Sequence, residues 1–341
     1  MEKVSRLRMF FHGKVFQLLC LIVVVISVTA AIRPSALNTA NLRQILNNIT
    51  VAGIFVCGVS PLLMSGSIDF SGSALGNIGG LVLAAVLSSI PGIPWPIAVV
   101  IALISGAILG LGNAFFVVKL NLVPFIATMG FGAAVTALGV WSVVSIPIPI
   151  TVTAFTRLSA VFVFNVVPLF FVVVLAFVIL YSIILNRTGF GRSVLMCGGN
   201  SYAARLAGLN PGKIKTILFV NSGLISALAG VIYASQSRFG NPNSFSTSIP
   251  HMTAFIASIL GGVSFFGGSG SLIGAFFGVA LMNLLAYSLQ SMGANLWING
   301  LINGLLLIIA LTIDDVSRRI RLRKMGIKAS PTNMGMPGMH R

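Results

Sequence analysis

Apolar segments long enough to cross a lipid bilayer recur from one end of this sequence to the other. A bilayer core of about 30 Å needs about 20 helical residues, and several of the segments reach that length. Buried strands also give apolar runs, but those last only about 4–8 residues. The pattern therefore predicts an all-α integral membrane protein with about ten transmembrane helices. The predicted spans lie near residues 15–32, 45–64, 72–90, 97–118, 123–142, 160–185, 216–234, 252–264, 271–290 and 298–313.

The charged residues support this interpretation, and their placement orients the chain. They make up 7% of the sequence, whereas soluble domains carry about 25%. A net charge of +17 is also found in nucleic-acid-binding proteins, but here 16 of the 21 Lys and Arg residues fall in segments 1–14, 186–215 and 314–341. Cytoplasmic segments of membrane proteins are rich in Lys and Arg, and ten spans put all three segments on that side. We therefore predict a multi-pass protein with both termini cytoplasmic and no nucleic-acid partner.

The predicted organisation has three parts. A cytoplasmic tail (1–14) precedes a transmembrane domain (15–313), which contains the cytoplasmic loop 186–215, and a basic cytoplasmic tail (314–341) follows. The first span, with its basic start, also fits a cleaved signal peptide. Its apolar stretch is longer than the usual 7–15 residues, however, and no clear small-residue cleavage site follows it, which favours a retained span.

Two predicted spans share a spacing of small residues. Gly106 and Gly110 precede Asn113, and Gly274 and Gly278 precede Asn283. These spans are five apart and cross the membrane in opposite directions, as an inverted repeat would require. The alternative is a coincidence between two helices that each use small residues for close packing.

Asp69 is the one acidic residue that lies outside the predicted tails. A carboxylate at membrane depth is costly unless it is paired, caps a helix or lines a cavity. Asp69 precedes a predicted span, and together with Ser67 and Ser71 it can cap backbone N–H groups or anchor the loop. The alternative is a role in proton or ion coupling, which one carboxylate supports only thinly.

Catalytic and metal-binding patterns are absent from the sequence. Its three His and three Cys residues are scattered, and no paired-cysteine metal motif occurs. The glycine cluster 261–270 lacks the Gly-Lys-Ser/Thr ending of a phosphate-binding loop. We therefore predict a protein that is not an enzyme, holds no metal or cofactor and does not itself hydrolyse ATP. The glycines of this cluster, Gly261, Gly262, Gly267 and Gly268, are expected to separate two spans.

The basic loop 186–215 contains a signal for a short helix. Asn200 or Ser201 can cap a helix through Ala203–Ala207, and Gly208 can end it. A small capped helix on the cytoplasmic face is suited to docking of another protein. The alternative is a solvated basic connector.

Four motifs, in this order, resemble the permease subunits of ribose-type monosaccharide ABC importers, which are inner-membrane components of binding-protein-dependent transport systems. The motifs occupy Ser67–Gly72, Pro124–Gly130, Arg187–Leu209 and Leu260–Gly278. The resemblance implies a ten-span subunit of the bacterial inner membrane with a fold related to the cobalamin-importer permeases. It also implies that the chain pairs with a second permease copy or paralogue and with ATPase subunits that bind the ATP, and that an extracytoplasmic sugar-binding protein delivers the substrate.

The resemblance implies roles for individual residues as well. The segment Gly198–Asn210 corresponds to the coupling helix that inserts into the ATPase, with Gly198, Gly199, Asn200, Ala203, Ala204, Arg205 and Gly208 as its candidate contacts. The candidate structural or pathway residues are Asp69, Ser71, Pro124, Phe125, Thr128 and the four glycines of the 261–270 cluster.

The substrate stays open at this point. Relatives often carry acidic residues just before the eighth span, where this chain has Ser248–Ala254, and it has Gly66-Ser67 where they have two glycines. The predicted function is a permease subunit for a ribose-like or related monosaccharide. The alternatives are a permease for branched-chain amino acids or nucleosides, and a secondary transporter that needs no ATPase.

Overall fold

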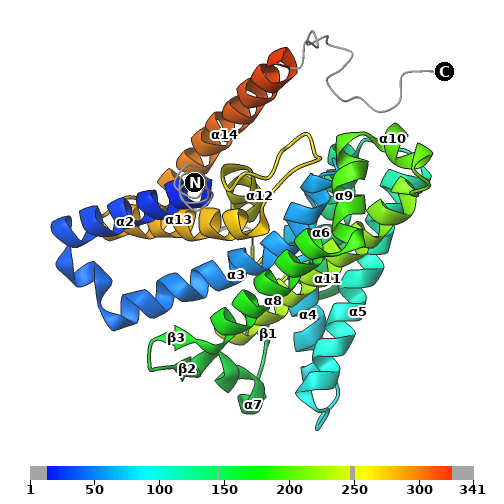
Figure 1. Cartoon of the computed structure of the whole chain (residues 1–341). Helices are drawn as coiled ribbons and strands as arrows, with labels where there is room; N and C mark the ends of the chain where they lie inside the picture. The colour runs from blue at the N-terminus through cyan, green and yellow to red at the C-terminus, as the bar shows by residue number, and fades with distance from the viewer. Residues whose placement is uncertain (1–13, 144–145, 246–249, 325–341) are drawn as a thin grey trace.

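The computed structural model describes residues 14–143, 146–245 and 250–324, and it is built almost entirely of helices (Figure 1). Among the described residues, eight helices are long and apolar enough to cross a membrane. This architecture is the predicted all-α integral membrane protein. The eight helices are α2 (Lys14–Ile32), α3 (Thr39–Met64), α4 (Gly72–Ser89), α5 (Trp95–Ala114) with the π-helical turn Phe115–Lys119, α6 (Pro124–Val143), α8 (Leu169–Arg187), α11 (Pro211–Ser237) and α13 (Leu272–Ser291).

The two remaining predicted spans correspond to α12 (Pro250–Leu260) and α14 (Leu296–Lys324). The 11 residues of α12 give a rise of about 16 Å, which is about half of a bilayer core. The 29-residue α14 continues past residue 313 to Lys324, so the helix enters the segment that the sequence assigned to the tail. The shorter elements are α7 (Thr153–Thr156), α9 (Gly189–Gly199), α10 (Ser201–Leu206), the 3₁₀ turns Pro34–Leu37 and Arg157–Ala160, and the strands β1 (Ile148–Pro149), β2 (Phe162–Val163), β3 (Val167–Pro168) and β4 (Phe239–Gly240).

The predicted sixth span, 160–185, was wrong at its beginning, because the helix starts only at Leu169. The residues before it form the antiparallel hairpin β2–β3. Phe164 and Asn165 both have positive φ, at 49° and 61°, which is the backbone of a tight hairpin turn. Pro168 then precedes the helix in an extended conformation. Hydropathy alone cannot separate an apolar hairpin from the apolar helix that follows it.

The buried centre of the bundle is α3, which is covered by α8, α11, α12 and α13. Most of its residues from Ile45 to Met64 are buried, whereas α2 is largely exposed on the surface. In Figure 1, α9 and α10 lie at one end of the molecule, and α7 with the β2–β3 hairpin lies at the other end. The buried helix therefore runs inside a ring of spans whose outer faces are apolar.

Small residues bring α11 close to α4 and α5. A Cβ atom at Gly79 of α4 would lie 2.5 Å from Ala227 Cα, and one at Gly106 of α5 would lie 2.5 Å from the Gly223 carbonyl oxygen. A Cβ atom at Gly230 of α11 would overlap the carbonyl oxygen of Gly76. Such close backbone approach provides packing where lipid gives no hydrophobic drive for helix association.

The two helices that share a small-residue spacing have matching surroundings. The first, α5, packs against α11 and α4, and the second, α13, packs against α3 and α12. An inverted repeat would pair these helices in this way, with α3 equivalent to α11 and α4 equivalent to α12. The repeat and the relation to the cobalamin importers stay predictions.

Candidate functional site

The loop between α8 and α11 folds as two short helices that are capped by side chains. Thr188 caps α9 by accepting a bond from Gly191 N, and Asn200 Oδ1 caps α10 by accepting bonds of 3.0 Å from the backbone N–H groups of Tyr202 and Ala203. Gly208 follows with φ of +81°, a conformation that favours glycine. The predicted short helix, its cap at Asn200 and its end before Gly208 are confirmed. We refer to residues 189–206 as the α9–α10 segment.

Apolar side chains of the α9–α10 segment are exposed. Met196 is 46% exposed, Tyr202 66% and Leu206 75%, whereas Ala204 is fully buried. Ordered helices with exposed apolar side chains are what a docking surface would require, and the solvated connector stays the alternative. The contact with an ATPase itself stays a prediction.

The end of α9 packs backbone against backbone on two other loops. Gly268 N donates a 2.9 Å bond to the carbonyl oxygen of Met64 at the end of α3. A Cβ atom at Gly198 would overlap that same oxygen, and a Cβ at Gly267 would lie 2.9 Å from both Gly198 O and Gly66 N. We call Gly66, Gly198, Gly267 and Gly268 the glycine junction. It brings the α9–α10 segment into contact with the α3–α4 and α12–α13 loops, which the sequence did not indicate.

The four glycines of the 261–270 cluster separate into two groups. Gly267 and Gly268 have φ of +85° and +79° and belong to the glycine junction. Gly261 packs instead on Gly274 of α13, and Gly262 lies beside the Lys14 side chain. The cluster does separate α12 from α13, as expected.

Asp69 lies in a buried set of polar side chains that we call the polar cluster: Asp69, Ser71, Asn113, Ser222 and His251. The carboxylate accepts bonds from Ser71 N at 2.8 Å, Ser71 Oγ at 2.6 Å and Ser222 Oγ at 2.7 Å. Ser71 Oγ in turn accepts a 2.7 Å bond from Asn113 Nδ2. Asp69 therefore anchors the α3–α4 loop to α11, and through Ser71 to α5. These bonds agree with a structural role for Asp69, which accepts the backbone N–H of Ser71 just before α4, and the choice between this role and one in transport stays a prediction.

His251 was missed as a member of this cluster. It is 3% exposed and lies against Gly72, and its Nε2 has no hydrogen-bond partner among the described residues. Its ring also packs edge-on against Phe55 at 5.2 Å between centroids. No local pattern indicated that His251 belongs to the cluster, because Asp69 lies in the α3–α4 loop and His251 lies in α12, far apart in the chain. The polar residues Asn113 and Ser222 within apolar spans were the available signal for the rest of the cluster.

The remaining pathway candidates lie beside the polar cluster. Thr128 Oγ1 accepts a 3.0 Å bond from Phe70 N and donates a 2.8 Å bond to the Pro124 carbonyl oxygen. The Phe125 ring packs edge-on against Phe70 at 5.1 Å between centroids. The start of α6 is therefore fastened to the segment that carries Asp69.

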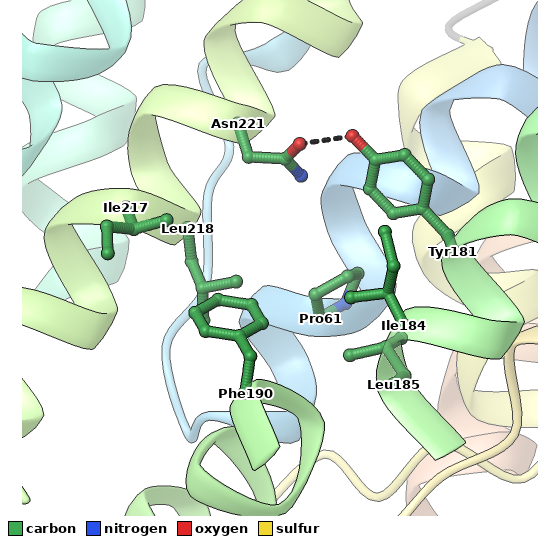
Figure 2. Close-up of a pocket in the computed structure, with 8 residues that line it drawn as sticks. All are labelled: Pro61, Tyr181, Ile184, Leu185, Phe190, Ile217, Leu218 and Asn221. Atoms are coloured by element: carbon green, nitrogen blue, oxygen red, sulfur yellow. Dashed lines mark hydrogen bonds between the residues drawn. The ribbon is translucent and has the colours of Figure 1, made fainter. Parts of the chain in front are cut away.

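A further polar contact lies where α3 contains a proline. Asn221 of α11 donates a 3.1 Å bond from Nδ2 to the Cys57 carbonyl oxygen, and the Tyr181 hydroxyl of α8 donates to Asn221 Oδ1 (Figure 2). Both side chains line a crevice of about 140 Å³ whose other walls are mostly apolar. Its lining residues are Pro61, Tyr181, Ile184, Leu185, Phe190, Ile217, Leu218 and Asn221.

Within the described residues, no three His, Cys, Asp or Glu side chains come together as a metal site would require. Two carboxylates are buried among the described residues: Asp69 in the polar cluster, and Asp314, which accepts bonds from Ser264 Oγ and Phe265 N.

Comparison with known proteins agrees with this architecture. The galactose/methyl galactoside import permease MglC of Haemophilus influenzae is 28% identical over 312 residues, which cover 86% of this chain and 92% of the relative. The ribose import permease RbsC of Bacillus subtilis is 29% identical, with 87% and 90% covered. The fructose import permease FrcC of Rhizobium meliloti is 28% identical, with 93% and 89% covered. No solved structure gives a significant match.

A family model described as "Branched-chain amino acid transport system / permease component" matches residues 41–311, which include both the polar cluster and the α9–α10 segment. The named relatives are all import permeases rather than enzymes. The match covers well over half of the chain, and the chain therefore belongs to this family of multi-pass transport permeases.

Proposed function

We propose that this chain is the membrane-spanning subunit of an ABC importer for a monosaccharide. The observation that carries the proposal is the near full-length match to three permeases named for galactose, ribose and fructose import. In this proposal the energy comes from a separate subunit that binds and hydrolyses ATP, which the match to import permeases supports. The chain itself takes no cofactor.

The α9–α10 segment is the contact with that ATPase. Its helices are preformed by the Thr188 and Asn200 caps, so little ordering entropy is lost when a partner binds. Its exposed Tyr202 and Leu206 side chains supply apolar area for the contact. In this arrangement the protein lies in the bacterial inner membrane, and the α9–α10 segment and both termini face the cytoplasm.

The other partners follow from the same proposal. An extracytoplasmic sugar-binding protein docks at the end of the bundle that carries α7 and the β2–β3 hairpin, opposite the α9–α10 segment (Figure 1). A second permease copy or paralogue completes the pathway. The exposed apolar faces of the outer spans, such as those of α2 and α8, are available for lipid and for this second subunit.

The alternatives concern the substrate class and the source of energy. The family description favours branched-chain amino acids as a second substrate class, with nucleosides as a third. A secondary transporter would need a carboxylate that exchanges protons, whereas Asp69 is 3% exposed and already accepts three bonds. The geometry therefore supports an ATP-driven mechanism over proton coupling.

The test is uptake of labelled solutes by cells of the native host that lack the chain and by cells in which it is restored. The panel contains galactose, ribose, fructose, leucine and uridine. We expect restored uptake of one of the sugars and of neither other solute. Restored uptake of leucine or uridine without any sugar would replace the proposed substrate class.

A further inference from the structure

The buried helix α3 lacks one of its own backbone hydrogen bonds. Pro61 lies inside α3 and has no N–H. The Cys57 carbonyl oxygen, one turn before it, therefore has no backbone donor within the helix. Asn221 Nδ2 replaces that donor at 3.1 Å, and the Tyr181 hydroxyl holds the Asn221 side chain by bonding to its Oδ1. At this point the Asn221 side chain of α11, which is held by Tyr181 of α8, satisfies the main chain of α3.

Space for movement lies next to this position. The crevice of about 140 Å³ in Figure 2 is walled by Pro61 and by the apolar side chains of Leu185, Phe190 and Leu218. The last turn of α3, which we call the terminal turn (Pro61–Met64), borders the crevice through Pro61. A tilt toward the crevice would also move Leu62, Leu63 and Met64, which are buried in the core.

The terminal turn ends at the glycine junction. Its Met64 carbonyl oxygen accepts from Gly268 N and lies against Gly198, the next-to-last residue of α9. No side chain separates these backbones, so a displacement of α9 reaches the terminal turn without being absorbed by rotamer changes.

The polar cluster continues the connection beyond the terminal turn. The carboxylate of Asp69, five residues after Met64, is bonded to Ser222 on α11 and through Ser71 to Asn113 on α5. The Phe70 N–H is bonded to Thr128 on α6. A shift of the terminal turn therefore acts on three spans at once.

We propose that the terminal turn of α3 is a hinge that transmits motion of the α9–α10 segment into the membrane-spanning bundle. Gly198 and Asn221 are positioning residues in this transmission. Gly198 contacts the terminal turn at Met64, and Asn221 supplies the hydrogen bond to Cys57 that Pro61 cannot make. The inference rests on the proposed function, because it assigns the route by which an ATPase acts on the permease.

The first test compares two adjacent glycines. Gly198→Ala places a methyl group against Met64 O, whereas a Cβ at Gly199 lies 3.8 Å from its nearest neighbour, Gly268 Cα. Three quantities are measured for each variant: its amount in the membrane, sugar uptake by cells, and ATP hydrolysis by the complex purified through this chain. We expect Gly198→Ala to lower uptake at least tenfold while ATP hydrolysis per complex stays within twofold of wild type. Gly199→Ala should leave both unchanged.

The second test separates a hinge from a merely structural bond. Asn221→Ala leaves the Cys57 carbonyl without its donor and should lower the amount of protein in the membrane. In Pro61→Ala/Asn221→Ala the restored N–H at position 61 satisfies that carbonyl within the helix. We expect this double variant to recover wild-type amounts but less than a tenth of wild-type uptake. This test also applies where Gly198→Ala fails to assemble.

Two outcomes would overturn the hinge. Equal uptake by Gly198→Ala and Gly199→Ala at equal protein amounts would show that the contact transmits nothing. Wild-type uptake by the double variant would show that Asn221 only completes the helix. If the wild-type complex hydrolyses ATP but transports none of galactose, ribose and fructose, the proposed function itself is wrong. The hinge proposal, which rests on that function, is then wrong as well.

Discussion

In the polar cluster the charged group is buried and its bonds come from this chain, whereas in the α9–α10 segment apolar side chains are exposed. Asp69 is 3% exposed and Leu206 is 75% exposed. Glycines outside these two regions also differ in packing. A Cβ at Gly230 of α11 would overlap a backbone atom of α4, whereas a Cβ at Gly208, which follows α10, would meet nothing within 4 Å. The first region is held mainly by hydrogen bonds within this chain, and the second is the surface that we propose a partner covers.

The largest effect of a substitution on stability is expected where α4 and α11 are in contact. Gly230→Val places a branched side chain against the backbone of Gly76, so the two helices must separate. Overpacking typically costs about 1–3 kcal/mol and more where backbone must move, so we expect a loss above about 3 kcal/mol. The measurement is the amount of monodisperse protein after extraction in detergent.

The matched control for this change is Gly130→Val on α6. A Cβ there meets nothing within 4 Å, and we expect a stability change within about 0.5 kcal/mol. If the two variants accumulated equally, the interior would be less tightly packed than the structure shows.

The next effect concerns the carboxylate of the polar cluster. Asp69→Ala removes the acceptor for Ser71 and Ser222 in a buried site, which costs about 1–3 kcal/mol for an unsatisfied group. Asp69→Asn keeps one acceptor oxygen for Ser71 and can donate to Ser222 Oγ, so its cost should be smaller. Thermal unfolding in detergent measures the difference.

A permease with normal amounts of Asp69→Asn but no uptake would contradict this structural role for Asp69. In that case the negative charge itself, rather than its hydrogen bonds, would be needed for transport.

The smallest effect on stability is expected at the exposed end of α10. Leu206→Ser changes a side chain that is 75% exposed, so stability should change by less than about 0.5 kcal/mol. Sugar uptake should nevertheless fall at least fivefold, because apolar contact area with the ATPase is lost. Ala204→Asp is the contrasting variant, since it puts a charge at a fully buried position and should unfold α10 itself. Wild-type uptake by Leu206→Ser would remove α10 from the ATPase contact.

The sequence predicted these two regions unequally. The cap at Asn200 and the turn at Gly208 are local signals, and the helix they predict at Ala203–Ala207 is present at Ser201–Leu206. The anchoring by Asp69 was predicted as a role, but its partner Ser222 lies 153 positions away and could not be identified from spacing. The glycine junction was missed for the same reason: Gly66 and Gly267 come from two loops and Gly198 from the end of α9, and only tertiary packing brings them together.

Hydropathy located the membrane-spanning helices well and failed where apolar residues were not helical. The beginning of α8 was misplaced, because residues 162–168 are apolar and form a hairpin. Pro61 was visible in the sequence, and it removes the backbone donor to the Cys57 carbonyl oxygen. No local pattern could predict that Asn221 of α11 replaces this donor.

The source of energy for uptake tests the central claim most directly, namely that a separate ATPase drives this chain through the α9–α10 segment. Uptake of the transported sugar is measured in cells depleted of ATP, and in cells treated with a protonophore while ATP is held constant. We predict that uptake stops in the first case and continues at wild-type rate in the second. Uptake that survives ATP depletion and stops with the protonophore would contradict the account and favour a secondary transporter.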